Sequence, residues 1–227
     1  MFKKIYEEKN KIIIALTLIV IGVVGRLSFY QILPDTPSIY ITLNGVTQPM
    51  FMMDLFFLIA AIALISGLLL GSYYTFVVPI SVMIITDLIL GNTWILLFVW
   101  SGFALIGLIG YMLNIRGKLT LKRVPNILGA GIGGVLIYDL WTNFGCWVGW
   151  YPHTINGLSM CFTVAIPFIL WHLLSTTFIL TIILIPIIYL KEKKILETDK
   201  VIRPIEKRIA LITPAVLMVL AIISLTM

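Results

Sequence analysis

The chain has 227 residues, of which 60% are hydrophobic and only 11% are charged, and its formal net charge is +6. A soluble domain typically carries about 25% charged residues, so this composition excludes a soluble globular protein and makes membrane lipid the expected surroundings. The positive charge does not indicate nucleic-acid binding, because the basic residues stand in short segments between apolar stretches and form no stripe interleaved with aromatic residues.

Seven apolar stretches approach the roughly 20 residues that a helix needs to cross a bilayer. In chain order they are Lys11–Tyr30, Met50–Leu70, Tyr74–Leu90, Thr93–Leu113, Asn126–Trp150, Ala165–Leu190 and Ile209–Met227. Proline, glycine and asparagine, which favour turns, separate several of them. We therefore expect an all-α integral membrane protein, with a six-helix bundle over 1–190, a basic cytoplasmic linker over 191–208 and a seventh membrane-spanning helix over 209–227.

The basic residues predict how these helices are oriented. Lysines and arginines concentrate in the cytoplasmic loops of membrane proteins. All of them except Arg26 precede or begin the first stretch, or lie between the fourth and fifth or the sixth and seventh stretches. Seven spans place these three segments on one side, so we expect a multi-pass protein of the cell membrane with its N-terminus in the cytoplasm and its C-terminus outside.

A second set of polar residues is embedded in the apolar stretches. With the orientation above, its members all fall in the outer half of the protein: Arg26, Asp54, Asp87, Asp139, Asn143 and His172. A charge at the bilayer centre costs roughly 2.5–3.5 kcal/mol and usually faces a cavity or a partner. We expect a shared polar cavity that binds a small-molecule ligand. The alternative is that Arg26 pairs with one aspartate and braces the bundle, but one arginine cannot neutralise three acids.

The tryptophans gather at the same outer end. All six lie in the outer halves of their stretches, whereas the aromatic belt of a membrane protein normally occupies both interfaces. We expect Trp94, Trp147, Trp150 and Tyr151 to stack on a flat ligand. An aromatic belt at the outer interface is the alternative.

Two further features concern packing and crosslinking. The glycine-rich run Gly129–Gly134 opens the fifth stretch, and small residues four apart let helices approach closely. It is no phosphate loop, because it follows no strand and carries no lysine. Cys146 and Cys161 stand on either side of the outer connection, and the sequence leaves open whether they form a disulfide.

Motifs of catalysis and of cofactor binding are missing from the sequence. There is no Ser/His/Asp set, no HExxH zinc motif, no dinucleotide fingerprint and no Walker motif. We therefore expect a protein that is not an enzyme, has no cofactor and no metal site, and cannot hydrolyse ATP by itself.

Six short segments between residues 12 and 190 form a pattern. They are Gly25-Arg26, Thr86-Asp87-Leu88-Ile89-Leu90-Gly91, Thr142-Asn143-Phe144-Gly145-Cys146-Trp147, Tyr151-Pro152-His153-Thr154, Gly157-Leu158-Ser159-Met160-Cys161-Phe162 and Ala165-Ile166-Pro167-Phe168. Together they resemble uncharacterised six-helix proteins allied to the substrate-binding (S) components of energy-coupling-factor (ECF) transporters. The resemblance implies a six-helix bundle that captures a vitamin or a related micronutrient from outside. It also implies partners, namely a transmembrane coupling subunit and two ATPases.

The sequence differs from that family in three places. Many S components carry an alanine-x-x-x-alanine pattern in helix one, but here Ala15 is followed four residues later by Ile19. The seventh helix lies outside the six-helix pattern and would place the C-terminus outside. No histidine precedes His153, so the N-terminal histidine motif of nickel and cobalt S components is absent.

The leading hypothesis from the sequence is a substrate-capture membrane subunit of a micronutrient importer, which binds its ligand at the outer face. A stand-alone proton- or cation-coupled carrier, with the aspartates as a relay, is the first alternative, and ATP-dependence of uptake distinguishes the two. A membrane structural protein that transports nothing is the second alternative, and it predicts no ligand.

Overall fold

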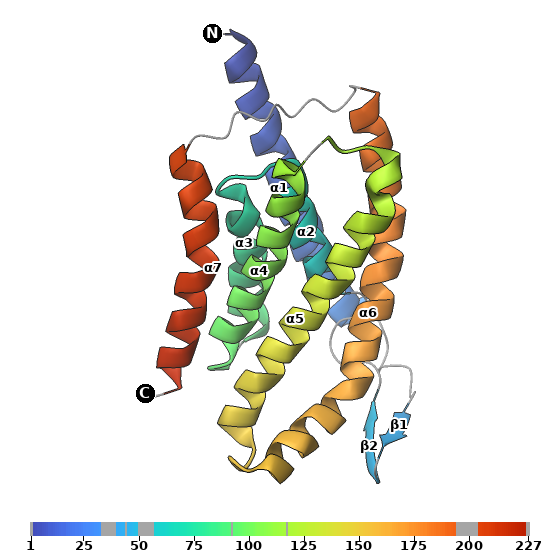
Figure 1. Ribbon diagram of the computed structural model, residues 1–227, viewed down its shortest axis with the longest axis vertical. Coiled ribbons are helices and arrows are strands. Elements are labelled where there is room, and N and C mark those ends of the chain that lie inside the picture. Colours follow the sequence, from blue (N-terminus) through green and yellow to red (C-terminus); the bar gives the residue numbers. More distant parts are fainter. Residues whose placement is uncertain are drawn as a thin grey trace.

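The computed structural model describes residues 2–32, 40–43, 45–49, 57–91, 93–116, 118–193 and 204–225. Within them the chain forms seven α-helices, a 3₁₀ turn and one β-hairpin (Figure 1). The helices are α1 (Phe2–Ile32), α2 (Leu58–Leu69), α3 (Tyr74–Leu90), α4 (Leu96–Ile115), α5 (Val124–Trp150), α6 (Ile155–Glu192) and α7 (Pro204–Ser224), and the 3₁₀ turn η1 spans Leu121–Arg123. The predicted all-α fold class is confirmed.

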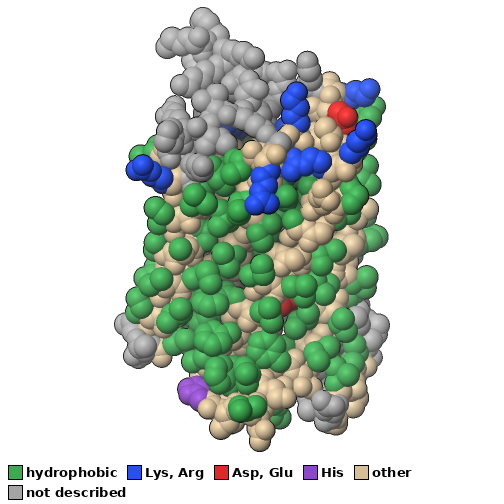
Figure 2. All heavy atoms as spheres, viewed as in Figure 1, with side chains coloured by type: hydrophobic (Ala, Val, Ile, Leu, Met, Phe, Trp, Pro, Cys, Tyr) green, Lys and Arg blue, Asp and Glu red, His purple; other side chains and the backbone are tan. Residues whose placement is uncertain are grey.

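Among the described residues, four segments are long and apolar enough to cross a membrane: Lys9–Ser28, Leu96–Ile115, Leu121–Trp150 and Ile155–Glu192. Three further helices, Leu58–Leu69, Tyr74–Leu90 and Arg208–Ser224, are apolar but shorter. Figure 2 shows apolar side chains along the length of the bundle, with lysines and arginines gathered at one end. Contiguous apolar surfaces of this size are rare on soluble monomers, which indicates a membrane protein.

Helix α2 lies at the centre of the bundle. It contacts α1, α3, α4, α5 and α6, and 11 of its 12 residues are buried. A helix that is apolar on all sides is expected in such surroundings. At 1.5 Å per residue it is about 18 Å long, which is less than the hydrocarbon thickness of a bilayer. Residues 50–56, which the predicted span also includes, lie outside the described residues.

Glycines bring the backbones of α2 and α4 into direct contact. A Cβ atom added to Gly67 would overlap the carbonyl oxygen of Gly107, and one added to Gly110 would overlap that of Leu64. Small residues let membrane helices approach in this way. The close approach holds α4 beside the buried helix, and α4 carries two residues of the site described below.

The glycine-rich run at the start of α5 has two different faces. An added Cβ at Gly131 would lie 2.5 Å from Cδ1 of Leu180 on α6. At Gly129 and Gly133 it would meet nothing within 4 Å. Close packing, which the sequence predicts for this run, is therefore present at Gly131 and joins α5 to α6.

The sequence analysis does not predict the β-hairpin. Strands β1 (Tyr40–Leu43) and β2 (Val46–Pro49) pair antiparallel, with Leu43 opposite Val46, and both contact α6. Gly45 in the turn has φ +78°, a conformation that glycine adopts easily. The dipeptide Asn44-Gly45 between two short runs rich in β-branched residues is the signal that could have predicted a hairpin.

Helix α6 begins at Ile155 rather than at Ala165 as predicted. The Thr154 side chain caps it by accepting a hydrogen bond from the backbone N–H of Gly157 at 3.1 Å. Polar residues and a glycine interrupt the apolar pattern in the first turns of α6, so the sequence does not indicate a helix there. The connection between α5 and α6 is only Tyr151–Thr154. Helix α6 changes direction near this end (Figure 1), and Pro167 inside it accounts for a bend.

Helix α7 packs against α4 and α3. Its buried residues Ala210, Pro214 and Ala221 lie at steps of four and seven and therefore share one face. Figure 1 shows the N- and C-terminal ends of the chain at opposite ends of the bundle. The short buried residues let α7 lie close to α4.

Candidate functional site

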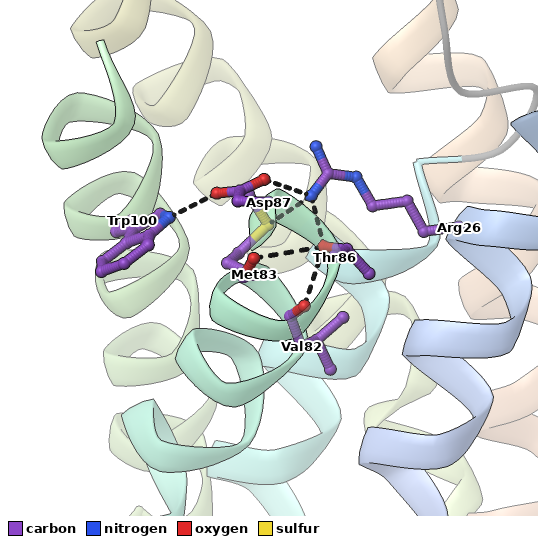
Figure 3. A network of polar contacts seen from close by, with 6 residues as sticks. All are labelled: Arg26, Val82, Met83, Thr86, Asp87 and Trp100. Carbon is purple, nitrogen blue, oxygen red and sulfur yellow. Dashed lines mark hydrogen bonds and ion pairs between the residues drawn. The ribbon is translucent and has the colours of Figure 1, made fainter. Parts of the chain in front are cut away.

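The first cluster of embedded polar residues joins α1, α3 and α4 (Figure 3). Nη1 of Arg26 lies 2.8 Å from Oδ1 of Asp87. The indole N–H of Trp100 donates to Oδ2 of the same carboxylate at 2.9 Å. The Asp87 side chain is only 6% exposed, but each of its oxygens accepts a hydrogen bond, one of them from a charged donor.

Two further residues of α3 complete the contacts of Arg26. Nη1 donates to the hydroxyl of Thr86 at 2.6 Å and lies 3.4 Å from the sulfur of Met83. Met83, Thr86 and Asp87 share one face of α3 because they are three and four residues apart. The alternative to a ligand site is that Arg26 pairs with an aspartate and braces the bundle. The structure contains such a pair, with Asp87 as the partner.

The second cluster joins α5 and α6. Nδ1 of His172 lies 2.6 Å from Oδ1 of Asp139. Asp139 is 2% exposed as a residue, whereas the His172 side chain is 24% exposed. An ionised carboxylate only accepts hydrogen bonds, so Nδ1 of His172 carries the proton of this bond.

Phe57 covers one face of the His172 ring. The two rings are stacked, with centroids 4.0 Å apart and planes 12° from parallel. The backbone N–H of Phe57 donates to the hydroxyl of Ser175 at 3.3 Å, and this hydroxyl donates to the carbonyl of His172 at 3.3 Å. Since Phe57 directly precedes α2, these contacts tie the start of the central helix to α6.

The other carboxylate oxygen of Asp139, Oδ2, is buried and has no hydrogen-bond partner among the described residues. Leaving a buried acceptor without a donor costs about 1–3 kcal/mol, and more when the acceptor is charged. Asp139 therefore keeps a hydrogen-bonding capacity that Asp87 has already used.

Helix α4 links the two clusters. Trp100 bonds to Asp87 in the first. Phe103, one turn further along α4, packs in the second, with its ring centroid 5.5 Å from that of Phe57 and 4.7 Å from that of Tyr138. The embedded polar residues thus form two pairs with different partners, joined by one helix.

The remaining polar residues predicted for the site take separate places. The side-chain amide of Asn143 donates to the carbonyl of Asp139, on its own helix, at 2.7 Å. The carbonyl of Asn143 accepts from Sγ of Cys161 at 3.5 Å. Cys146 and Cys161 are both free thiols. Asp54 lies outside the described residues.

Tryptophans at the end of the bundle that is predicted to face outward pack on one another and on the protein. The rings of Trp94 and Trp150 meet edge to face at 5.3 Å, and an added Cβ at Gly149 would overlap the Trp94 ring. The indole N–H of Trp147 donates to the carbonyl of Pro152 at 3.1 Å. Trp150 is still 56% exposed, and stacking on a flat ligand stays a prediction.

Tyr151 begins the connection between α5 and α6. Partial burial raises the pKa of its phenol above the ordinary value of 10.0, and the nearby thiols of Cys161 and Cys146 raise that pKa further. The phenol is therefore protonated at neutral pH and available as a hydrogen-bond donor.

The sequence analysis does not place Trp100, Phe57 or Ser175 in the site. One signal for Trp100 exists, because it lies inside an apolar stretch rather than at its end, where belt tryptophans stand. Ser175 has a signal as well, because it stands three residues after His172 and therefore on the same helix face; Phe57 has none. Their contacts join α2 to α6, and no local pattern reports which helices become neighbours.

The chemistry open to the second cluster is limited by its geometry. Asp139 and His172 resemble two members of a Ser/His/Asp set, but the hydroxyl of Ser175 donates to the backbone carbonyl of His172 and not to its ring. Within the described residues, no group of three or more His, Cys, Asp or Glu side chains could hold a metal ion. The pair is suited to binding protons and hydrogen-bond donors.

The fold and these buried charge pairs define an all-α protein whose apolar helices are able to cross a membrane. Residues 7–199 match a protein family described as "Family of unknown function (DUF6580)". The match covers most of the chain, so the chain belongs to this family, and α7 begins just after the matched residues. No curated protein and no solved structure matches the chain.

Proposed function

We propose that this protein is the substrate-capture subunit of a micronutrient importer and binds a vitamin-like small molecule in the outer half of its helix bundle. One observation carries the proposal. Asp139 is buried on an apolar helix beside His172, and one of its carboxylate oxygens has no partner among the described residues. Ionisable residues within membrane helices are costly and usually serve a ligand, an ion or a proton. The unmet oxygen supports a ligand because it is an acceptor in a fixed position.

The resemblance to S components supports the same function from a different direction. Three residues of its motifs, Arg26, Thr86 and Asp87, meet in the structure although they come from α1 and α3. In this proposal the energy comes from a transmembrane coupling subunit and two ATPases, since the chain carries no ATP-binding motif.

The orientation in the membrane is part of the proposal. Lysines and arginines gather at one end of the bundle (Figure 2), and we assign this end to the cytoplasm. The connection between α5 and α6 then faces outward. On a background without Cys146 and Cys161, a cysteine at position 153 should react with a membrane-impermeant maleimide on intact cells, whereas one at position 118 should react only after permeabilisation. Labelling of position 118 in sealed cells would reverse the orientation.

A second function is favoured by the short bond between Asp139 and His172. Such a pair can hold or pass on a proton, as a stand-alone proton-coupled carrier would require. The two functions differ in their energy source. Uptake by the importer stops when ATP is depleted at constant proton gradient, whereas uptake by the carrier stops when the gradient is collapsed at constant ATP.

Ligand capture itself can be tested before any substrate is known. The purified protein in mild detergent is incubated with a metabolite extract of the expression host, washed and examined by native mass spectrometry. We expect one small molecule to be retained at a defined stoichiometry. Retention of lipid and detergent alone would favour a structural protein, in which the Arg26–Asp87 pair only braces the bundle.

A further inference from the structure

The described surroundings of Asp139 contain very little other charge. Helices α2, α4 and α6 and the turn η1 pack against α5, and η1 and the hairpin also pack against α6. Within these elements the charged residues besides Asp139 and His172 are Lys122 and Arg123 of η1 and Lys191 and Glu192 of α6, which lie together because the backbone N–H of Leu121 donates to Glu192. Among the described residues, the ring of Tyr138 lies edge-on to that of His172, with centroids 6.3 Å apart.

A second buried polar atom lies near Asp139 where α5 packs against α6. The hydroxyl of Thr176 is buried and, like Oδ2 of Asp139, has no hydrogen-bond partner in the part of the chain that the structure describes. Thr176 is one turn along α6 from His172 and therefore on the same face. Helices α5 and α6 run antiparallel, with contacts between Asp139 and His172 and between Gly131 and Leu180. Thr176 lies midway between His172 and Leu180 on α6, and therefore between these two contacts with α5.

The charge of the site determines which group it accepts. With Nδ1–H of a neutral His172 donating to Oδ1, the pair carries a net charge of −1 in apolar surroundings. An anion would add to this charge, whereas a cation that donates a hydrogen bond would neutralise it. Arg26 already bonds to Asp87 through Nη1. Since no basic residue other than His172 bonds to Asp139 in the described part of the chain, we expect the neutralising group to be a bound molecule.

We propose that Oδ2 of Asp139 binds a protonated nitrogen of the captured molecule: an ammonium, an amidinium or a protonated ring nitrogen. This inference rests on the proposed function and adds the chemical class of the ligand.

The test uses the metabolite extract as the probe and compares four proteins: the wild type, Asp139→Asn, His172→Gln and Thr142→Val. Thr142 is a matched control, because it is buried on the same helix and its hydroxyl bonds only to carbonyls of that helix. The retained compound is released and identified by fragmentation. We expect it to contain a basic nitrogen, to be retained by Thr142→Val, and to lose affinity roughly 10- to 100-fold in Asp139→Asn.

His172→Gln keeps a donor for Oδ1 and leaves the Asp139 carboxylate charged, so it should still retain the compound. The identity of the compound retained by the wild type decides the matter if Asp139→Asn does not fold. The inference is wrong if the retained compound lacks a basic nitrogen, or if Asp139→Asn binds it like the wild type. In each of these cases a compound is still captured, so the proposed function stands. If the wild type retains nothing, both fall.

Discussion

Asp87 and Asp139 are both buried aspartates on apolar helices, and they differ in how many of their carboxylate oxygens accept a hydrogen bond from a described residue. Asp87 receives a guanidinium on one oxygen and an indole N–H on the other. Asp139 receives an imidazole N–H on one oxygen, and no described residue donates to the other. We propose that this difference separates a carboxylate that stabilises the bundle from one that binds a ligand.

The two regions also differ in what a mutation removes. A buried charge that loses its partner is destabilising by several kcal/mol. Neutralising a buried carboxylate that lacks a donor on one oxygen also removes the cost of that unmet charge. Removing a partner of Asp87 should therefore lower stability. Neutralising Asp139 should mainly change binding. The predictions below test this contrast, beginning with the largest expected effect.

Arg26→Met should be the most destabilising of these substitutions. It leaves Asp87 buried without the guanidinium that pairs with it, which we expect to lower the free energy of unfolding by about 3–5 kcal/mol. Arg26→Lys is the control, because it keeps the charge and should recover part of the loss. Denaturant titration in detergent measures both. Equal stability of Arg26→Met and the wild type would show that the ion pair does not brace the bundle.

Trp100→Phe tests the neutral donor of the same carboxylate. It has a close match in Trp141→Phe, because Trp141 donates its indole N–H to the uncharged hydroxyl of Ser101 at 2.8 Å. We expect a loss of about 1.5–3 kcal/mol for the bond to the charged acceptor and about 0.5–1.5 kcal/mol for the neutral one. The comparison cancels much of the change in ring size. A larger loss at Trp141 would contradict the role given to Asp87.

Gly131→Ala tests whether the spacing of α5 and α6 matters for the second region. The added methyl would press on Leu180, and overpacking of this kind costs about 1–3 kcal/mol. Gly129→Ala, two residues away on the open face, should be neutral or stabilising by up to about 1 kcal/mol. Thermal unfolding of the two variants provides the measurement. Equal melting temperatures would show that the contact at Gly131 is not tight.

Much of the helical framework can be predicted from the sequence, because long apolar stretches report membrane helices directly. The stretches Tyr74–Leu90 and Thr93–Leu113 correspond closely to α3 and α4. The sequence predicts the start of α6 too late, because polar residues interrupt its first turns and a single threonine caps it. It does not predict the hairpin, because each strand has only four residues and no apolar stretch marks them.

The candidate site could be predicted only as a set of residue types. Embedded charges are visible in a sequence, so Arg26, Asp87, Asp139 and His172 stand out from their apolar neighbours. Which of them pair depends on how the helices pack, and that packing depends on close contacts such as Gly67 with Gly107. Trp100 and Phe57 complete the pairs through contacts between helices that no local pattern contains.

The most direct measurement compares Asp87→Asn and Asp139→Asn for unfolding free energy and for retention of the compound taken up from the metabolite extract. We predict that Asp87→Asn loses about 1–3 kcal/mol of stability, because its charge-assisted bond to Arg26 is lost, and still retains the compound when folded. Asp139→Asn should change stability by less than about 1 kcal/mol and lose the compound. The account is contradicted if the two variants lose stability equally and retain the compound equally, because both carboxylates would then be braces.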